Sequence, residues 1–292
     1  MGKGIGGLNM AGITAIILTK NEENYIGACI DSIKNIVSRI YVVDSFSNDK
    51  TIDILKEKKV EFIQHKFENY AKQYKYAVDT AKVKTTWILR IDADEWMTKL
   101  SSNELKELCE KYNCDSNITG IQIRFVNVFM GKQIKHGGMY PWVKLSVYKT
   151  DVGDIEQREM DEHIVLKYGK VIKAKHDSVH MCFKGLDFFI KKANWYSTRE
   201  MMDFYKNSNV NKENADFKTM IKMHIYYKLP LGLRSWVYYK YRYIFRLGFL
   251  DGKIGKIYFF LSCYWYRFLV DAKIYEQNLI PKELDCIGEL KD

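Results

Sequence analysis

The feature that most constrains this chain is a regular alternation of apolar runs and helix-like segments over residues 13–91. Runs of the length of a buried strand lie at 13–18, 39–44, 60–64 and 87–91. Segments with helical spacing of their apolar residues lie between them, at 25–37, 51–58 and 70–81. Strands that alternate with helices in this way pair in parallel and are covered by helices. The sequence therefore predicts an α/β fold with a mostly parallel central sheet and helices on both faces.

Acidic side chains follow two of these predicted strands. Asp44 ends the second strand, and Asp92, Asp94 and Glu95 follow the fourth within four positions. Ligands of open α/β sheets bind beyond the carboxyl ends of the strands, so we expect these side chains at one rim. Three carboxylates this close repel one another unless a cation lies among them, and Mg2+ or Mn2+ accepts carboxylate and phosphate oxygens. The stretch predicts a site for a metal–diphosphate complex; the alternative is a solvated acidic turn that caps the next helix.

Composition and missing motifs exclude several classes of protein. No Gly-x-Gly-x-x-Gly or Gly-x-x-x-x-Gly-Lys-Ser/Thr motif follows a predicted strand, which argues against a dinucleotide site or a P-loop. The six cysteines have no paired spacing and fit reduced thiols in the cytoplasm better than a disulfide scaffold. No apolar run is long enough to predict a membrane-spanning helix.

The chain beyond residue 98 is less regular. Helical spacing recurs at 101–112 and 185–205, and strand-like runs lie at 119–130 and 142–148. Residues 165–173 predict a hairpin that turns at Tyr168-Gly169. We expect three regions along the chain: a flexible leader at 1–12, a catalytic domain at 13–225 and a basic, aromatic helical extension at 226–292.

Several of these motifs resemble those of a known family. Residues 13–98 resemble the nucleotide-sugar-binding half of a family 2 glycosyltransferase with the GT-A fold. The resemblance is carried by Thr-Lys-Asn-Glu at 19–22, by Asp-Ser-x-Ser-x-Asp-x-Thr at 44–51 and by Arg-Ile-Asp-Ala-Asp-Glu at 90–95, which is similar to the family's DxD motif. Residues 246–252 and 272–273 resemble a bacterial subgroup that includes the lipopolysaccharide-core β-1,4-glucosyltransferases.

The resemblance implies a site for a nucleotide sugar, with a UDP-hexose as the first expectation. It implies that the donor is bound by six side chains, those of Thr19, Asn21, Glu22, Asp44, Ser45 and Asp92. It implies that Asp94 ligates Mn2+ or Mg2+. In some enzymes with this fold a late histidine completes the metal shell, and His180 is the candidate here, although a lone histidine is more often structural. Lys144 and Arg124 could contact phosphate, or could equally be solvated.

Inverting sugar transfer also needs a carboxylate that takes the proton from the acceptor hydroxyl. The family's base lies well after the metal motif, and Asp161 and Glu162 are the matching residues. The sequence does not decide between them, because Asp-Glu-His departs from the commoner Glu-Asp order. The alternative is that both belong to a solvated acidic loop.

The last part of the chain is basic and aromatic. Fourteen aromatic residues lie between positions 236 and 268, and eight basic residues face two acidic ones between 234 and 273, in a chain of net charge +10. Trp and Tyr favour the bilayer interface and Lys and Arg favour anionic headgroups, so the extension predicts peripheral docking on a membrane. The alternatives are ordinary core packing and stacking on single-stranded nucleic acid; the second is disfavoured because no nucleic-acid-binding module accompanies it.

These observations predict a cytoplasmic, metal-dependent inverting glycosyltransferase at the inner face of the cytoplasmic membrane. Its expected acceptor is a lipid-linked or lipopolysaccharide-core glycan, and nucleic acid is not an expected partner. Two alternatives stay open at this point. A metal-dependent nucleotidyltransferase would also gather acids around a metal–phosphate complex, but it would release pyrophosphate. A non-enzymatic peripheral membrane or nucleic-acid-binding protein would leave the acids merely solvated.

Overall fold

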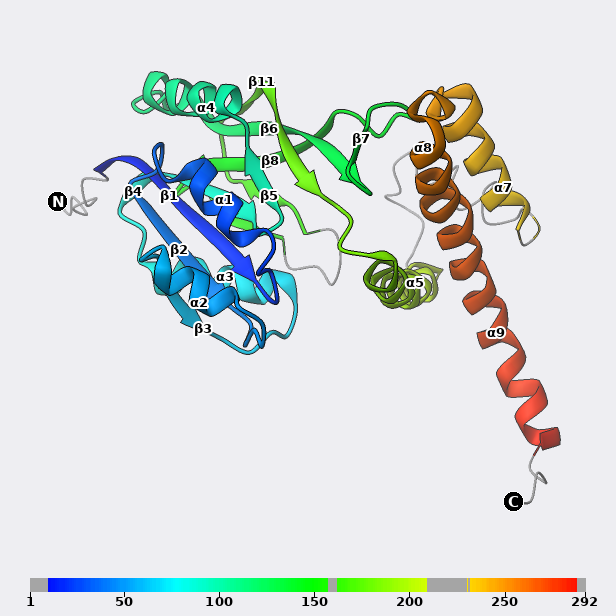
Figure 1. Ribbon diagram of the computed structural model, residues 1–292. Coiled ribbons are helices and arrows are strands. Elements are labelled where there is room, and N and C mark those ends of the chain that lie inside the picture. Colours follow the sequence, from blue (N-terminus) through cyan, green and yellow to red (C-terminus); the bar gives the residue numbers. More distant parts are fainter. Residues whose placement is uncertain (1–9, 157–161, 209–229, 231, 288–292) are drawn as a thin grey trace. The chain divides into compact units, whose positions relative to one another are not determined.

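The computed structural model describes residues 10–156, 162–208, 230 and 232–287 (Figure 1). The chain forms two compact units. The first contains residues 1–127 and 141–182, and the second contains residues 128–140 and 183–292. The domain limits expected from composition, 13–225 and 226–292, remain a prediction, and the compact units divide the chain at other places. Strand β1 begins at Met10, inside the segment expected to be a flexible leader.

The first unit is built on one large sheet. Its strands are β1 (Met10–Thr19), β2 (Arg39–Asp44), β3 (Glu61–Gln64), β4 (Thr85–Asp92), β5 (Glu95–Met97), β6 (Ile118–Phe129), β8 (Trp142–Lys149) and β11 (Lys170–Met181). They lie in the order β3-β2-β1-β4-β8-β6-β11-β5, and β7 (Lys132–Ile134) pairs with β6. The strands β3-β2-β1-β4 are parallel, whereas β8 joins β4 and β6 in antiparallel pairs, as β5 joins β11. The predicted α/β class is confirmed, with its parallel part confined to the first four strands.

Helices cover both faces of this sheet (Figure 1). On one face, α1 (Ile26–Ile33), α2 (Thr51–Glu57) and α4 (Lys99–Lys111) pack on the strands. On the other face lies α3 (Tyr70–Ala81), which begins where the Asn69 side chain accepts the backbone N–H of Lys72 at 2.9 Å. The buried positions of α1, at 26, 29, 30 and 33, have the spacing that places them on one side of a helix.

A small two-stranded sheet lies apart from the large one. It pairs β9 (Gly153–Ile155) with β10 (Ile164–Leu166). The hairpin expected at 165–173 is wrong, because β10 pairs with β9 whereas β11 pairs with β5. The chain does turn at Gly169, whose φ of +92° suits glycine, and a Cβ there would lie 2.2 Å from Thr119 Oγ1.

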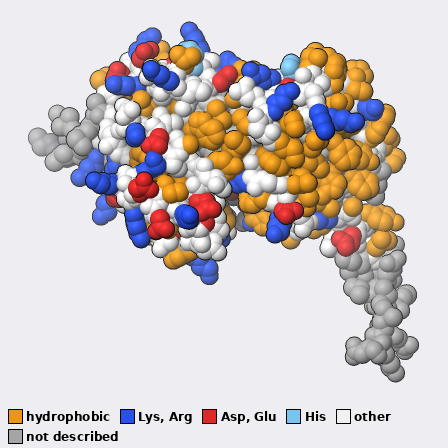
Figure 2. All heavy atoms as spheres, in the orientation of Figure 1, with side chains coloured by type: hydrophobic (Ala, Val, Ile, Leu, Met, Phe, Trp, Pro, Cys, Tyr) orange, Lys and Arg blue, Asp and Glu red, His pale blue; other side chains and the backbone are white. Residues whose placement is uncertain are grey.

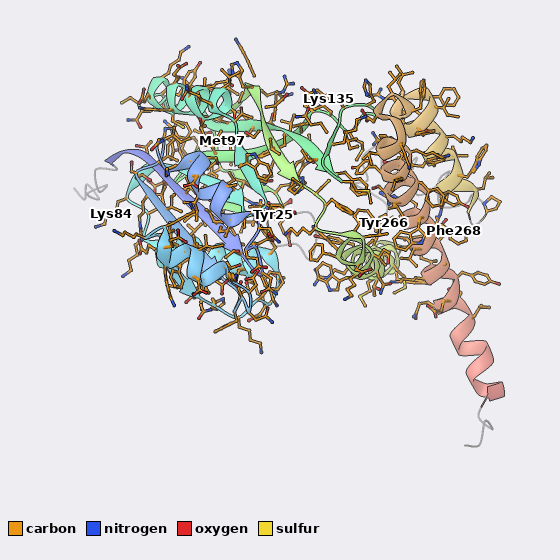
Figure 3. All side chains as sticks on the ribbon, in the orientation of Figure 1. Tyr25, Lys84, Met97, Lys135, Tyr266 and Phe268 are labelled. Atoms are coloured by element: carbon orange, nitrogen blue, oxygen red, sulfur yellow. The ribbon has the colours of Figure 1, made fainter. Side chains whose placement is uncertain are left out.

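The second unit is helical, as expected for the end of the chain. Its helices are α5 (Leu186–Ser208), α7 (Leu233–Lys240), η3 (Tyr241–Phe245), η4 (Gly248–Asp251), α8 (Gly252–Phe259), η5 (Phe260–Trp265) and α9 (Tyr266–Ile287). α7 runs directly into η3, and α8 runs through η5 into α9, so residues 233–287 form a hairpin of two helical rods. Tyr266, labelled in Figure 3, joins α9 to α5 by donating its hydroxyl to Glu200 Oε2 at 2.8 Å. Within the described ranges, every helix is too short or too polar to cross a bilayer.

Residues 128–140 belong to the second unit because they dock on its helices. The Asp251 carboxylate accepts the backbone N–H groups of Lys135 and His136, and it contacts His136 Nδ1 at 2.8 Å. Gly137 has a φ of +70°, and a Cβ on it would lie 2.1 Å from the ring of Phe259. The segment therefore follows the helices closely only because glycine stands at this position.

Candidate active site

Three strand ends meet at one rim of the sheet of the first unit. Thr19 at the end of β1 pairs with Asp44 at the end of β2, and Leu18 pairs with Asp92 at the end of β4. Side chains alternate between the two faces along a strand, so Asp44 and Asp92 leave the sheet on opposite faces. A ligand that contacts both carboxylates must therefore cross the rim itself.

The loops that follow β1 and β2 are bound to each other. Ser47 Oγ accepts the backbone N–H of Asn21 at 2.8 Å, and Asn21 Oδ1 accepts that of Asn48 at 2.9 Å. Thr51 Oγ1 accepts the N–H of Glu22 at 2.8 Å. Asn21 has a φ of +55°, a conformation that asparagine tolerates better than most residues. The side chain of Asn21, expected to bind substrate, here joins the two loops.

Asp44 and Ser45 hold the second of these loops. The buried Asp44 carboxylate accepts the backbone N–H of Ser47 at 2.9 Å, the Ser47 hydroxyl, and Gln64 Nε2 at 3.0 Å. Ser45 Oγ accepts Gln73 Nε2 from α3 at 3.1 Å. These contacts fix the shape of the loop before any ligand binds.

Thr19 has a different environment. Its side chain is buried, and among the described residues its hydroxyl has no hydrogen-bond partner. A buried polar atom without a partner costs stability unless a ligand or water satisfies it. This hydroxyl lies beside Asp44 at the rim, because Thr19 pairs with Asp44 across the two strands.

The acids that follow β4 surround a lysine. Lys144, on β8, donates to Asp92 Oδ2 at 3.0 Å and to Glu95 Oε1 and Oε2 at 2.6 and 2.8 Å. Glu95 is fully buried, and its Oε2 also accepts the backbone N–H of Asp92 at 3.0 Å. The rings of Phe125 and Trp142 lie beside the ammonium group. For Asp92 and Glu95, the cation that the sequence predicts among these carboxylates is therefore the ammonium group of Lys144.

Burial and neighbouring charges shift the titration of this cluster. Burial raises the pKa of Glu95 to about 7 although Lys144 opposes it. Burial would also raise the pKa of Asp92, but Lys144 and Arg90 outweigh it and hold that pKa below the usual range. Burial lowers the pKa of Lys144, whereas Asp92 and Glu95 raise it to a net value above normal. Asp92 and Lys144 are therefore both charged at neutral pH.

Arg90 links the acid cluster to one of the two predicted bases. Its guanidinium lies over the ring of Tyr70, and Tyr70 donates its hydroxyl to Asp92 Oδ1 at 2.5 Å. Arg90 Nη1 donates to the backbone carbonyl of Glu162 at 3.1 Å. Glu162 is thus brought to the end of β4, whereas Asp161 lies outside the described residues.

His180 lies on β11 beside the acidic turn. It pairs across the sheet with Glu95, and its ring lies 5.0 Å from that of Trp142. Its Nδ1 contacts Asn127 Oδ1 at 2.8 Å. Because an amide oxygen can only accept a hydrogen bond, Nδ1 is the donor in this contact. Metal-binding histidines are oriented in this way by a partner on the second nitrogen.

The donor set decides what kind of metal site these residues can form. Among the described residues, no three His, Cys, Asp or Glu side chains are arranged as a ready metal cage. Asp92 and Glu95 hold Lys144, which leaves Asp94 and His180 as candidates; their backbones adjoin, since Met181 N–H donates to the Asp94 carbonyl at 2.9 Å. Mg2+ and Mn2+ commonly take one or two protein ligands and complete their shell with waters and substrate phosphates. The residues therefore fit a cation that is bound together with a diphosphate.

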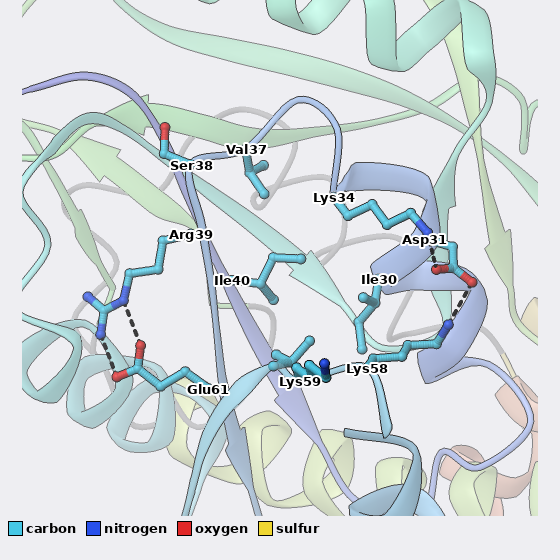
Figure 4. A pocket seen from close by; sticks show the side chains of 11 residues that line it. Ile30, Asp31, Lys34, Val37, Ser38, Arg39, Ile40, Lys58, Lys59 and Glu61 are labelled. Carbon is cyan, nitrogen blue, oxygen red and sulfur yellow. Dashed lines mark hydrogen bonds and ion pairs between the residues drawn. The ribbon is translucent and has the colours of Figure 1, made fainter. Parts of the chain in front are cut away.

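Two hollows of the first unit lie away from this rim. One, of about 440 Å³, opens near the amino ends of β2 and β3, between Ile30, Ile40 and Val60 (Figure 4). Most of its charged side chains pair with one another, Lys34 and Lys58 with Asp31 and Arg39 with Glu61. The second, of about 430 Å³, lies near Trp87 and Cys109. Neither hollow contains a residue of the predicted site.

The sequence located the rim but not the pairing within it. From the sequence, Lys144 is only a candidate contact for phosphate, and no local pattern marks Arg90 or Tyr70 as functional. Lys144 stands 49 residues from Glu95 in the chain, and no local pattern couples the two. Arg124, named together with Lys144, instead pairs with Asp177 at 3.0 Å.

Comparisons with known proteins agree with the motifs at this rim. The profile of the family described as Glycosyl transferase family 2 matches residues 14–161. An uncharacterized glycosyltransferase of Rickettsia typhi is 26% identical, over 92% of this chain and 89% of the relative. The lipopolysaccharide core biosynthesis glycosyltransferase LpsC of Rhizobium meliloti is 24% identical, over 92% and 93%.

Solved structures resemble the chain over a smaller part. Glucosyl-3-phosphoglycerate synthase from Mycobacterium tuberculosis, in complex with Mn2+, uridine diphosphate and glucosyl-3-phosphoglycerate, is 18% identical, with a TM-score of 0.33. The likeness covers 39% of this chain and 44% of that protein. The family profile spans half of the sequence and includes β1, β2 and β4 with the residues at their ends. The chain belongs to glycosyl transferase family 2.

Proposed function

We propose that this glycosyltransferase moves a hexose from a nucleotide sugar, a UDP-sugar in the first instance, to a hydroxyl of a lipid-linked or lipopolysaccharide-core glycan. The observation that carries the proposal is the acid cluster at the end of β4, which Arg90 ties to Glu162. In support of the proposal, the backbone carbonyl of Glu162 accepts a hydrogen bond from Arg90, on the strand that ends in Asp92. The relative LpsC, named for lipopolysaccharide core biosynthesis, supports the class of acceptor.

The donor would bind across the rim. Thr19 offers a buried hydroxyl that has no partner among the described residues, and Asp44 holds the adjoining loop in a fixed shape. We assign the nucleoside to this side, with Glu22, Asn21 and Ser45 in the surrounding loops. Asp92, on the opposite face and fixed by Tyr70 and Lys144, would contact the ribose. Because these groups are oriented before binding, little conformational entropy is lost when the donor binds.

The diphosphate would lie near Asp94. Asp94 and His180 would hold Mn2+ or Mg2+, with Asn127 orienting the imidazole. When bound, the cation stabilises the charge of the departing nucleoside diphosphate. Lys144 keeps Asp92 and Glu95 in place, so that they do not compete with the phosphates for the same cation.

Transfer would proceed by a single displacement. The acceptor hydroxyl oxygen attacks the anomeric carbon while the bond from that carbon to the diphosphate oxygen breaks, which inverts the configuration. Glu162 takes the hydroxyl proton in this step, as a positioned carboxylate base. Asp161 remains the alternative base. The reactants are a nucleotide sugar and an alcohol, and the products are a glycoside, a nucleoside diphosphate and a proton.

We place the reaction at the inner face of the cytoplasmic membrane, as a peripheral enzyme. A lipid-linked acceptor diffuses in the plane of the bilayer, so an enzyme held on the same surface meets it at a raised effective concentration.

The reaction products test this proposal. Purified protein is incubated with Mn2+, a panel of nucleotide sugars and lipid-linked or core-glycan acceptors, and both products are measured. We expect one nucleoside diphosphate for each glycoside formed, with inverted configuration at the anomeric carbon. Release of pyrophosphate from a nucleoside triphosphate, without glycoside formation, would instead support a nucleotidyltransferase.

A further inference from the structure

The helical hairpin of the second unit carries an apolar stripe on its surface. In the rod formed by α7 and η3, large apolar side chains are exposed at helical spacing, namely Leu233, Trp236, Val237, Tyr241, Ile244 and Phe245. Residues three or four apart share a face of a helix, so these six form one continuous stripe. Phe245 is 76% exposed, the highest value among them.

The turn and the second rod also expose large apolar side chains. Leu247, Phe249 and Leu250 are exposed in the turn, and Phe260 and Phe268 are exposed on the second rod. Phe268 and Tyr264 stack, and Phe260 and Tyr264 both contact the ring of Tyr239 on the first rod. We call these eleven exposed residues, six on the first rod, three in the turn and two on the second rod, the apolar face. Figure 2 shows hydrophobic side chains gathered over the helices of this unit.

The packing of the hairpin uses only the edge of this face. Phe260 contacts Tyr239 of the first rod, but the two rods meet mainly through other residues, including the buried pair of Arg234 with Asp271 and the buried Phe259 and Cys263. Single exposed apolar side chains are ordinary on a protein surface, but a continuous patch marks a site of interaction. A partner is therefore needed to explain why the exposed residues are apolar.

The charges around the face indicate the chemistry of that partner. Residues 232–250 contain no Asp or Glu, and the buried Asp251 is occupied with Lys135 and His136. Lys253 and Lys256 are exposed, and they lie two turns and one turn, respectively, before Phe260 on the second rod. Lys240, at the end of α7, lies over the ring of Trp236 in the stripe. Lysines beside exposed Trp, Tyr and Phe complement an anionic headgroup region above a hydrocarbon layer.

We propose that the apolar face docks on an anionic lipid bilayer, with its aromatic and aliphatic side chains in the interface and with Lys240, Lys253 and Lys256 at the headgroups. The proposal deepens the proposed function, since it names the surface that holds the enzyme beside a lipid-linked acceptor. Docking is monotopic, because the described helices are too short or too polar to span a bilayer. A second copy of the chain is the competing occupant, and the test below separates the two.

Vesicle co-sedimentation of the full chain tests the apolar contribution. The variant Val237→Ser/Tyr241→Ser/Phe245→Ser removes three side chains of the stripe. The matched control Leu100→Ser/Tyr168→Ser removes exposed apolar side chains from the first unit, where Leu100 and Tyr168 are 63% and 59% exposed. On phosphatidylcholine vesicles with about one third phosphatidylglycerol, we expect the stripe variant to bind about 30-fold more weakly and the control to bind as the unaltered protein does.

The charge contribution has its own variant. Lys253→Gln/Lys256→Gln removes two exposed ammonium groups near the face. We expect about 20-fold weaker binding to the same anionic vesicles, and no change on phosphatidylcholine alone, because each lysine near an anionic surface contributes a few-fold. Binding of the unaltered protein should also fall as salt rises, since salt screens these charges.

The outcomes separate this inference from the proposed function. Equal vesicle binding by the stripe variant and the control overturns the inference, as does an unaltered protein that ignores anionic lipid. A dimer in light scattering that the stripe variant abolishes, without vesicle binding, assigns the face to a second copy instead. UDP binding is measured on the same samples, and we expect the unaltered protein to bind UDP whether or not vesicles are present. If no UDP binding is found at all, that result counts against the proposed function and not against the docking face.

Discussion

Each unit contains a cation that pairs with buried acidic side chains, and the two cations differ in how many carboxylates they contact. In the second unit, Arg234 and Asp271 form one pair, 5% and 3% exposed, and Ser235 Oγ donates to the same carboxylate at 3.2 Å. In the first unit, two carboxylates, those of Asp92 and Glu95, share one cation, Lys144. A buried one-to-one pair needs nothing more, whereas two carboxylates that share one lysine are incompletely neutralised, and burial raises the pKa of Glu95 to about 7.

The pair in the second unit is structural, whereas the charges in the first unit lie where a ligand would bind. The pair in the second unit joins two helical rods that offer an apolar face to the outside. The cluster in the first unit lies at the carboxyl ends of parallel strands, where ligands of such sheets bind. Its excess carboxylate and its link to Glu162 connect it to the proposed transfer reaction.

The largest expected effect is on catalysis. Glu162→Gln keeps the size of the side chain and removes its ability to accept a proton. We expect kcat to fall by about 10² to 10⁴, with UDP affinity unchanged, because only the base is lost. Steady-state kinetics and calorimetry on one preparation measure both quantities. If Glu162→Gln and Asp161→Asn each retain full turnover, neither residue is the base.

The next effect is on stability in the first unit. Lys144→Met leaves Asp92 and Glu95 buried without their shared cation, and we expect the free energy of unfolding to fall by about 3–5 kcal/mol. Adding Asp92→Asn should restore more than half of the loss, because Glu95, whose pKa is about 7 even beside Lys144, takes up a proton when that cation is removed and leaves Asp92 as the unpaired charge. Urea denaturation measures both variants. No recovery in the double variant would mean that Lys144 stabilises the fold by packing rather than by charge.

The same experiment in the second unit sharpens the comparison. Arg234→Met should lower stability by about 3 kcal/mol, since it leaves Asp271 buried and unpaired with a cation. Arg234→Met should leave the Mn2+-dependent affinity for UDP unchanged, whereas Lys144→Met should lower it. Calorimetry at a temperature below unfolding measures this affinity. A loss of UDP affinity would show that this pair also supports the site.

The smallest effect concerns a contact that depends on pH. The Glu104 carboxylate accepts the backbone N–H groups of Lys175 and His176 and thereby joins α4 to β11. Burial raises the pKa of Glu104, but the hydrogen bonds from these donors lower it by a larger amount, so the pKa lies below its ordinary value. The ionised form therefore stabilises the fold above the pKa of the unfolded chain, and this is lost as pH falls through the lower, folded pKa. Glu104→Gln should cost about 1–2 kcal/mol at pH 7, and the difference should vanish in acid, once the pH falls below the lowered pKa of Glu104 in the folded protein.

Local patterns predicted much of the first unit. The strand at 39–44 and the helix at 70–81 have the expected bounds. The strand is a short apolar run that is buried on both faces, and the helix has one apolar face and an Asn cap at its start. The shared rim of β1, β2 and β4 also follows from alternation of strands and helices. Asp44 and Asp92 end β2 and β4, the two strands that flank β1, and they therefore lie at one rim of the sheet, as expected.

Long-range pairing could not be predicted in this way. The prediction of a hairpin at 165–173 is wrong because β10 pairs with β9. Periodicity identifies a strand but not the strand with which it pairs. Lys144 was missed as a member of the acid cluster for the same reason, since β8 pairs with β4 across a long chain separation. The docking of residues 128–140 on the second unit depends on Asp251, which is more than a hundred positions away.

The central claim is that Asp94 holds a divalent cation that binds a nucleoside diphosphate at the rim. Calorimetric titration of UDP, with Mn2+ and then with a chelator, tests it most directly on the unaltered protein, on Asp94→Ala and on the control Asp79→Ala, an exposed carboxylate paired with Lys75 on α3. We expect the unaltered protein and the control to bind UDP only when Mn2+ is present, and Asp94→Ala to lose that binding while it remains folded. Equal UDP affinity in all three proteins, with or without Mn2+, would contradict the account.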